Sequence, residues 1–412
     1  MSISSGPDIA ANDGLVFNYD MGNTQKSWKG APTTNLHPIS GFNTWPTQTL
    51  HFWNGTSWVV DGTYTDPGVP GPAGTYLGIV RKYTSGALSA TWSGNSYAYI
   101  LKTAPMTAGQ SYAMSAYTYL SSDCNIDGMH SSIEGATVSA LSGGYVTSYN
   151  MSQKGSWQRQ GLQGTASGDV NFIIAYPNKV GVTNGVFTGY ILVGGAQVEF
   201  GTFPTPYTDN SRSTTQAIID LTGTNTVTTT SLTYASDNTF SYNGVANYLT
   251  ISTFVNKPTT AITVESWIKP TKSTLTGTIR GASISATNSM YIGIIDSIDG
   301  GLTHALHWAN QTSINRVYSW NGNVPNNAWS HIVGTYDGTI MRAYLNGVQI
   351  FSAAQSGTIP DATYVLGTYG GTLTDGVHNF QGILPTSSIY NRALSAAEVQ
   401  QNFNALRGRF GI

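Results

Sequence analysis

Apolar and polar residues alternate with a period of two over many short runs of the chain, and turn residues separate these runs. Because successive side chains of a β-strand point to opposite faces of a sheet, such runs predict half-buried strands. The clearest alternating or continuously apolar runs are residues 111–120, 169–177, 189–200, 261–270 and 290–296. The chain is therefore predicted to consist mainly of β-strands.

A helical period of 3.6 residues is convincing in one segment only, residues 395–406. Ser395 and Glu398 have the spacing of a capping box at its start. Its apolar stripe consists of Val399, Phe403 and Leu406. Gly408 follows and is expected to end the helix.

Two turn dipeptides, Asp337-Gly338 and Asn346-Gly347, divide the segment that follows Trp329 into three runs. Each dipeptide is typical of a type I′ turn, in which both central residues need a positive φ. We expect a three-stranded antiparallel meander over 330–336, 339–345 and 348–353. Backbone geometry explains both dipeptides, so this segment is interpreted as scaffold and not as a binding loop.

Composition agrees with a β-rich protein, since only 9% of the residues are charged and 47 are glycine. The net charge of −2 argues against nucleic acid or an anionic membrane surface as a partner. No apolar run approaches the roughly 18 residues of a membrane span, and no signal peptide is visible, so we expect synthesis in a cytoplasm. The single cysteine, Cys124, excludes an intrachain disulfide and a thiolate metal cluster.

Paired carboxylates, which most glycosidases need, are missing from the sequence. Two carboxyl groups about 5–9.5 Å apart would stand as Glu-x-Glu or Glu-x-Asp on one strand, and no such pair is present. The glutamates are Glu134, Glu199, Glu265 and Glu398. Glu398 caps the helix, Glu199 and Glu265 lie within strand patterns, and Glu134 stands alone. Asp296 and Asp299 would point to opposite faces of a strand, so we expect no catalytic residues and no enzyme activity.

Metal and nucleotide sites are not expected either. His304 and His307 would point apart on a strand. The sequence contains no His-Glu-x-x-His helix, no phosphate-binding Gly-Lys-Ser/Thr loop and no Gly-x-Ser-x-Gly elbow.

Aromatic residues are the remaining candidates for a binding site, because sugar rings stack on Trp and Tyr. Trp267 and Trp329 fit core strand positions, and Trp157 is interpreted as buried. Trp53 and Trp58 flank residues 54–57, an expected hairpin turn that would expose at least one of them. They are the candidate carbohydrate-binding residues.

Residues 218–412 resemble a laminin-G-like (concanavalin A-like) jelly roll, in the version found in bacteriophage structural proteins. The resemblance rests on the order and spacing of TFSYNGVANYLTI, AITVESWIKP, NAWSHIVGTYDGTIMRAYLNGVQI, YVLGTYGG and NFQGILPTSSIYNRALSAAEVQQNF. It implies a domain that often binds glycans, sometimes through calcium near a Phe-Asp-Gly turn. Here that turn reads Tyr242-Asn243-Gly244, with an amide in place of the carboxylate. No cofactor is therefore expected, and calcium is the one alternative left open.

The block between two connectors, residues 65–74 and 208–216, resembles the carbohydrate-binding-module sandwiches of phage tail and head proteins. The matching stretches are AGQSYAMSAYTYL, GSWQRQGLQG and GAQVEFGTFPTPYTD. We therefore expect an all-β chain of two antiparallel β-sandwiches (jelly rolls) with one short C-terminal helix.

The expected domains are an N-terminal segment at 1–34, a strap at 35–65, an inserted sandwich at 66–212 and a jelly roll at 213–412. Residues 14–30 resemble the opening strand of the phage jelly rolls, whose usual continuation is found only at 217–228. An apolar strand with no partner would be a liability. We therefore predict that residues 14–20 pair with the C-terminal sheet, and a free arm that docks on a neighbouring subunit is the alternative.

Taken together, the resemblance implies a non-enzymatic virion structural or decoration protein of a phage head, neck or tail. Such a protein would be made in the host cytoplasm, displayed on the particle as a homo-oligomer among other virion proteins, and bind glycans weakly. The alternative is a tail-associated receptor-binding adhesin that recognises a host surface glycan. An exposed aromatic cluster in a concave loop site would favour the adhesin, and large apolar patches that meet other subunits would favour the decoration protein.

Overall fold

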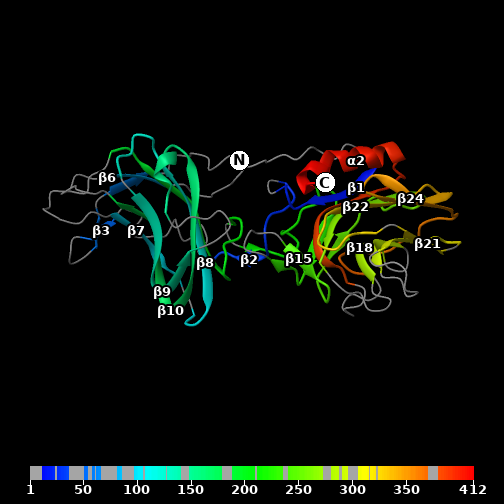
Figure 1. Ribbon diagram of the computed structural model, residues 1–412. Helices are drawn as coiled ribbons and strands as arrows, with labels where there is room; N and C mark the ends of the chain where they lie inside the picture. The colour runs from blue at the N-terminus through cyan, green and yellow to red at the C-terminus, as the bar shows by residue number, and fades with distance from the viewer. Residues whose placement is uncertain are drawn as a thin grey trace. The chain divides into compact units, whose positions relative to one another are not determined.

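The structure is a computed structural model that describes residues 12–23, 26–36, 51–53, 58–60, 62–65, 81–85, 97–104, 107–126, 128–140, 148–178, 188–208, 211–234, 240–271, 280–286, 290–295, 305–314, 316–321, 323–369 and 379–412 (Figure 1). These residues form two compact units. The first unit comprises 12–30 and 213–412, and the second unit comprises 31–212. The strands form antiparallel sheets and one α-helix lies near the C-terminus, so the predicted fold class is confirmed.

The first unit is a sandwich of an eight-stranded and a seven-stranded sheet. In the eight-stranded sheet, the order is β14-β15-β26-β17-β22-β23-β24, and β1 pairs with β26. Its strands are β1 (Leu15–Asp20), β14 (Thr233–Tyr234), β15 (Phe240–Asn243), β17 (Ile262–Pro270), β22 (Ser330–Tyr336), β23 (Ile340–Leu345), β24 (Val348–Ala354) and β26 (Gln381–Tyr390). The seven-stranded sheet has the order β13-β16-β25-β18-β19-β20-β21. Its strands are β13 (Thr226–Thr230), β16 (Tyr248–Thr253), β18 (Arg280–Ala286), β19 (Met290–Ile295), β20 (Ala305–Gln311), β21 (Arg316–Asn321) and β25 (Tyr364–Leu366).

Period-two alternation places the core between these sheets. On β17, Ile262 and Val264 join the large apolar cluster of the sandwich, whereas Trp267 packs in a separate cluster with residues of the C-terminal helix. Trp308 of β20 belongs to the sandwich cluster as well. A side chain at Gly334 of β22 would meet the Trp308 ring, since an added Cβ would lie 2.5 Å from it. Glycine at this position therefore allows the two sheets to approach.

The N-terminal strand joins the C-terminal sheet, as predicted for residues 14–20. β1 pairs antiparallel with β26, with Phe17 opposite Ile389 and Tyr19 opposite Ser387. The Tyr19 hydroxyl donates to the Leu384 carbonyl oxygen at 2.6 Å. Two paired strands of one sheet, β1 and β26, thus come from opposite ends of the chain.

The predicted meander over β22, β23 and β24 is confirmed, with one correction to its turns. Asn346 and Gly347 have φ values of 50° and 80°, as a type I′ turn requires. At the other turn only Gly338 has a positive φ, so the type I′ prediction for Asp337-Gly338 is wrong. Asp337 instead accepts hydrogen bonds from Thr339 N at 2.9 Å and Ile340 N at 2.7 Å, an Asx-type turn.

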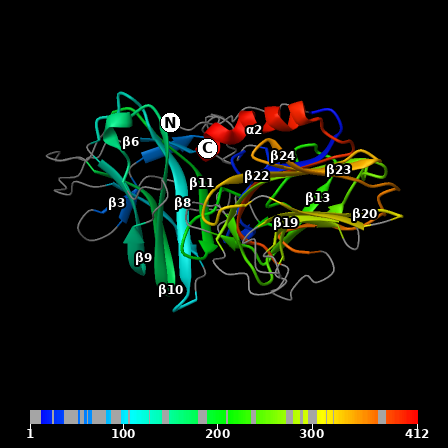
Figure 2. The same cartoon turned by 45° about the vertical axis from the view of Figure 1, so that its right-hand side comes forward.

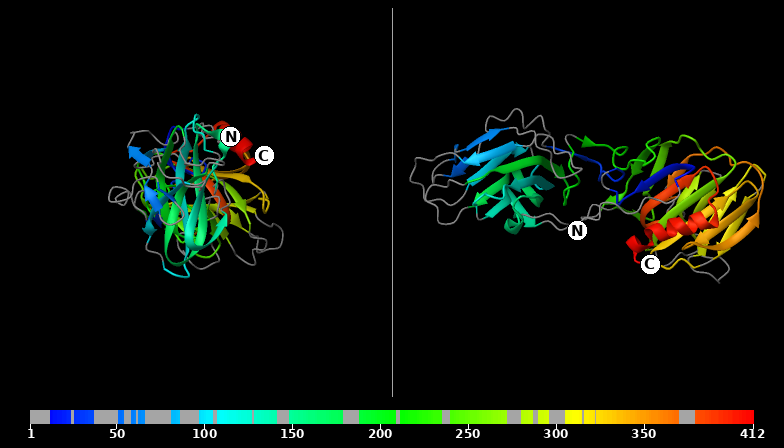
Figure 3. Two further views of the ribbon diagram at one scale, coloured as in Figure 1. Left: turned by 90° about the vertical axis from the view of Figure 1, so that its left-hand side faces the viewer. Right: turned by 90° about the horizontal axis from the view of Figure 1, so that it is seen from above.

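Helix α2 (Ala396–Phe410) covers the eight-stranded sheet on the face opposite the core (Figures 2 and 3). It begins with the predicted capping box, but the predicted end at Gly408 is wrong. Phe410 stacks on Trp267 at 4.3 Å, and Arg409 pairs with Asp20 of β1 at 2.7 Å. These contacts stabilise the last turn, and the helix ends at Gly411, whose φ is 72°.

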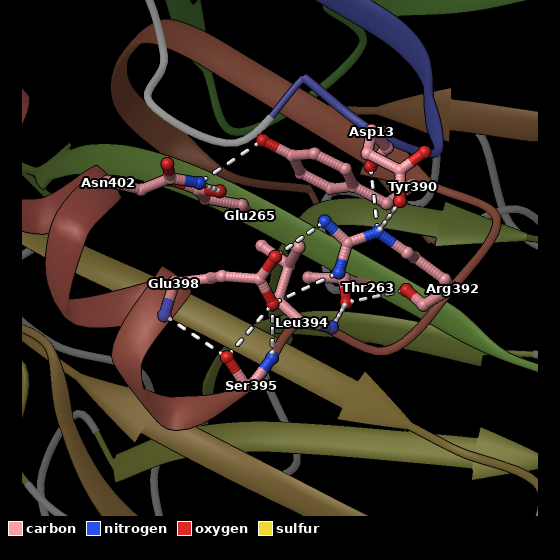
Figure 4. A network of polar contacts seen from close by, with 9 residues as sticks. All are labelled: Asp13, Thr263, Glu265, Tyr390, Arg392, Leu394, Ser395, Glu398 and Asn402. Carbon is pink, nitrogen blue, oxygen red and sulfur yellow. Dashed lines mark hydrogen bonds and ion pairs between the residues drawn. The ribbon is translucent and has the colours of Figure 1, made fainter.

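A polar network fastens this helix to the sheet (Figure 4). Glu265 of β17 accepts from Asn402 Nδ2 at 2.9 Å and contacts His331 Nε2 at 2.7 Å. At the helix start, Arg392 contacts both carboxylate oxygens of Glu398, at 2.7 and 3.0 Å. Glu265 is 3% exposed, so this carboxylate has a structural role, as its strand pattern predicted.

Among the described residues of the second unit, nine strands form an antiparallel sheet in the order β4-β3-β7-β10-β8-β11-β6-β5, with β9 paired to β10. The strands are β3 (His51–Trp53), β4 (Trp58–Val60), β5 (Gly62–Thr65), β6 (Arg81–Ser85), β7 (Tyr97–Ala104), β8 (Ser111–Leu120), β9 (Gly128–Ala140), β10 (Trp157–Asn178) and β11 (Ile191–Phe200). A short 3₁₀ turn, η1 (Met151–Gln153), precedes β10. β3, β4 and β5 are strands of this sheet, so the expectation that 35–65 is a separate strap is wrong.

The two segments through which the chain enters and leaves the second unit are tied together. β2 (Thr33–Thr34) pairs with β12 (Ser211–Arg212). Arg212 donates to the Ala31 carbonyl oxygen at 2.9 Å, and Thr33 donates to Glu199 at 2.7 Å. Glu199 has no exposed surface and also accepts from Thr205 N at 2.6 Å. The Glu199 carboxylate therefore links Thr33, where the chain enters this unit, to Thr205, near where it leaves.

Candidate functional site

Four partly exposed aromatic side chains gather on one face of the second unit. Tyr117, Tyr119, Trp157 and Tyr190 pack around the buried Leu192. We call these five residues the aromatic face. Large aromatic side chains that keep part of their surface in water often mark a place of recognition.

Strand alternation explains why these residues share a face. On β8, Met114, Ala116 and Leu120 are buried, whereas the alternating Tyr117 and Tyr119 are partly exposed. Antiparallel register then aligns the neighbours of Tyr119. Lys82, Leu192, Tyr119 and Trp157 are successive register partners across β6, β11, β8 and β10, which lie side by side (Figure 2). Three strand spacings of about 4.8 Å make this row roughly 14 Å long.

The rings form a continuous surface around Tyr119. Its ring lies 6.1 Å from that of Tyr190 with an interplanar angle of 17°, and 5.7 Å from that of Trp157 with an angle of 54°. Burial raises the pKa of the Tyr119 phenol, and the neighbouring Tyr190 adds to the shift. Tyr119 therefore stays neutral at physiological pH and keeps its hydroxyl as a hydrogen-bond donor.

Two cations border the aromatic face. Lys82 Nζ lies 4.2 Å from the centre of the Tyr190 ring, and the Arg159 guanidinium lies 5.3 Å from that of Tyr117. Arg159 also donates to Ser115 Oγ at 2.7 Å and to the Thr205 carbonyl oxygen at 2.5 Å. The position of Arg159 is thus held by the protein itself.

This arrangement provides groups that can contact a sugar. Flat rings pack against the C–H faces of a pyranose, while hydroxyl and cationic groups bind its oxygens. Farther along β11, Gln197 Nε2 donates to Glu199 at 2.6 Å. Both side chains are buried and hydrogen-bonded within the protein. The aromatic face therefore offers stacking surface and hydrogen-bond donors but no paired carboxylates.

The residues predicted as sugar ligands lie elsewhere in the sheet. Trp53 and Trp58 are register partners in the β3–β4 hairpin, and their side chains lie outside the described residues. β7 and β10 separate this hairpin from β8. The prediction for these two residues therefore stays a prediction. Trp157, interpreted as buried, packs against Leu192 but remains partly exposed.

The other sequence candidates have structural roles or fall outside the described residues. His307 is buried and hydrogen-bonds the Tyr291 hydroxyl. His304, Asp296, Asp299 and the Glu134 side chain lie outside the described residues. Within the parts of the chain that the structure describes, no three His, Cys, Asp or Glu side chains come together as a metal site. Among those same parts, no helix has both the length and the apolar character needed to cross a membrane.

At the turn where the resemblance implied calcium, the side chain of Asn243 serves the turn itself. Its Oδ1 accepts from Val245 N at 2.8 Å and from Ala246 N at 3.2 Å. Asn247 Oδ1 in turn accepts from Asn243 N at 2.5 Å. The amide thus stabilises the turn through backbone hydrogen bonds.

A comparison with known protein families matches the C-terminal part of the first unit. Residues 243–400 match the concanavalin A-like lectin/glucanases superfamily, in its Laminin_G_3 family. This part of the first unit is therefore similar to a lectin-like β-sandwich domain, while the match does not extend to the second unit. A search of curated proteins gave no match.

The solved structures that the chain matches are distant in sequence. Domain 4 of a GH43 extracellular arabinanase from Geobacillus stearothermophilus, in complex with arabinotriose, is 19% identical over 46% of this chain and 92% of its own, with a TM-score of 0.33. The binding domain of botulinum neurotoxin DC, in complex with rat synaptotagmin II, is 15% identical over 47% of this chain, with a TM-score of 0.35. This chain spans 50% of that toxin domain.

Proposed function

We propose that the protein is a non-enzymatic glycan-binding protein and that the aromatic face of the second unit is its binding site. The observation that carries the proposal is the row of Leu192, Tyr119 and Trp157 across adjacent strands, with Tyr190 stacked beside it. A row of partly exposed rings on a rigid sheet is preorganised, so little conformational entropy is lost when a ligand binds.

Truncation of the rings tests this proposal. Binding of the full-length protein to a glycan array identifies a ligand, and calorimetry then measures its affinity. We expect Trp157→Ala and Tyr119→Ala each to weaken binding by about tenfold, because an aromatic contact contributes about 0.5–1.5 kcal/mol beyond its buried area.

A matched control is Phe200→Ala, which removes an aromatic residue of the same unit that is 59% exposed and lies outside the aromatic face. This variant should bind like the wild type. Equal affinities of all these proteins, with unchanged melting temperatures, would contradict the proposed site.

We also propose that the protein is a virion component, made in the host cytoplasm and displayed on a phage particle as a homo-oligomer among other virion proteins. The sequence resemblance supports this role. The alternative is a tail-associated receptor-binding adhesin, in which the aromatic face would bind a host surface glycan. Mass spectrometry of separately purified heads and tails tests the assignment, and absence of its peptides from both fractions would refute it.

A further inference from the structure

The charged groups around the aromatic face are unevenly distributed. Lys82 and Arg159 each place a cation near a tyrosine ring of this face. Asp123, in the exposed turn after β8, is a carboxylate that contributes to the raised pKa of Tyr119. Two cations therefore border the rings themselves, although the whole chain has a net charge of −2.

The two cations differ in the contacts that they make with other protein groups. Arg159 is held by Ser115 Oγ and the Thr205 carbonyl oxygen. Lys82 makes no ion pair with any residue in the described ranges, and its ammonium lies above the Tyr190 ring. An ammonium group has three donors, and a ring face engages the cation from one side only. Lys82 therefore keeps donors for a ligand.

Register places Lys82 where a ligand on the rings would meet it. Lys82 pairs with Leu192, and Leu192 pairs with Tyr119. Lys82 therefore lies at one end of the row, and Trp157 lies at the other end. A short oligosaccharide laid across the strands would cover Tyr119 and reach Lys82. An anionic substituent on its terminal sugar would then form a charge-assisted hydrogen bond.

We propose that the aromatic face selects glycans that carry a carboxylate, and that Lys82 binds this carboxylate while the rings stack against the sugar. This inference rests on the proposed function, because it assigns a ligand class to the same face. Stacking supplies much of the affinity and tolerates many sugars, whereas the lysine supplies the discrimination between acidic and neutral ones.

The test compares ligands that differ in charge alone. Full-length protein is titrated with a panel of hexuronic-acid oligosaccharides and with the same oligosaccharides after reduction of each carboxylate to a hydroxymethyl group. We expect the acidic forms to bind about tenfold more tightly at low salt, and this advantage should shrink as salt screens the charge. Titrations with sialyllactose and with lactose make the same comparison for a carboxylate on a sialic acid.

Variants then assign the discrimination to one residue. Lys82→Gln should lower the affinity for acidic glycans about tenfold and leave that for the reduced forms unchanged, whereas Lys82→Arg should keep the preference. Lys26→Gln, which removes an exposed lysine of the first unit, controls for net charge and should change nothing.

The outcomes separate this inference from the proposed function. If acidic and reduced glycans bind equally, and Trp157→Ala weakens both, the face is a glycan site without charge selection, and the present inference is refuted. If no glycan of the panel or the array binds, both the site and its ligand class are wrong. If Lys82→Gln keeps the acidic preference, the recognition of the carboxylate does not lie with Lys82.

Discussion

Phe17 offers the sharpest test of how the first unit is assembled. Its side chain has no exposed surface and lies in the core of the sandwich, 6.5 Å from the ring of Phe254. Phe17 is opposite Ile389 in the β1–β26 pairing, although 372 positions separate them in the chain (389 − 17 = 372). Phe17→Ala should therefore destabilise a sandwich formed mostly by residues beyond 213.

The expected magnitude follows from burial. Replacement of a buried phenylalanine by alanine costs about 3–5 kcal/mol, from lost apolar transfer and from the cavity that remains. For a unit of roughly 200 residues, each kcal/mol lowers the melting temperature by about 2–4 °C. Phe17→Ala should thus lower the melting temperature of the first unit by roughly 6–20 °C.

Differential scanning calorimetry of the full-length protein is the assay, because two units with separate cores are expected to give two transitions. Leu162→Ala identifies the second transition, since Leu162 of β10 has no exposed surface. Phe200→Ala, at an exposed position, should move neither transition by more than about 2 °C. If Phe17→Ala left both transitions in place, or moved only the one that Leu162→Ala moves, the β1 pairing would be wrong.

Three further predictions concern charge, metal and catalysis. Arg392 holds the pKa of Glu398 at about 2, below its ordinary value. A lowered folded-state pKa stabilises the protein above the unfolded pKa of about 4.3, and this is lost as pH falls toward 2. Because both side chains are partly exposed, Glu398→Gln should cost about 1 kcal/mol at pH 7 and almost nothing near pH 2; melting curves measure this, and a pH-independent difference would contradict it. Chelation of divalent metal should change the melting temperature by less than about 2 °C, whereas a drop of several degrees would restore a calcium site near Asn243. The pure protein should release no reducing sugar from polysaccharides, and steady release would overturn the non-enzymatic proposal.

Local patterns predicted many elements of the fold. Alternation located the strands, the Asn346-Gly347 pair formed its type I′ turn, and the capping box started α2 at the predicted residue. These features depend on neighbours a few residues apart, so their physics is contained in a short stretch of sequence. The N-terminal strand was predictable for a different reason, since an apolar strand with no local partner must find one elsewhere.

The binding face could be predicted only in part. Tyr117 and Tyr119 are two residues apart and therefore share a face in any strand. That spacing does not reveal which face of the sheet keeps contact with water. Nor does it reveal that register brings Trp157, Tyr190 and Lys82 beside these tyrosines from three other segments.

The sequence by itself determined the period of the elements, the Asn346-Gly347 turn, the N-terminal cap of α2 and the absence of a paired-carboxylate motif. Tertiary structure alone decided that α2 runs past Gly408, because Phe410 and Arg409 find partners on β17 and β1. It also decided that Trp157 is partly exposed on the second unit and that the Glu199 carboxylate accepts a hydrogen bond from Thr205 N. The physical reason is the same in each case: burial and pairing are set by residues that are distant in sequence and meet only when the sheets have formed.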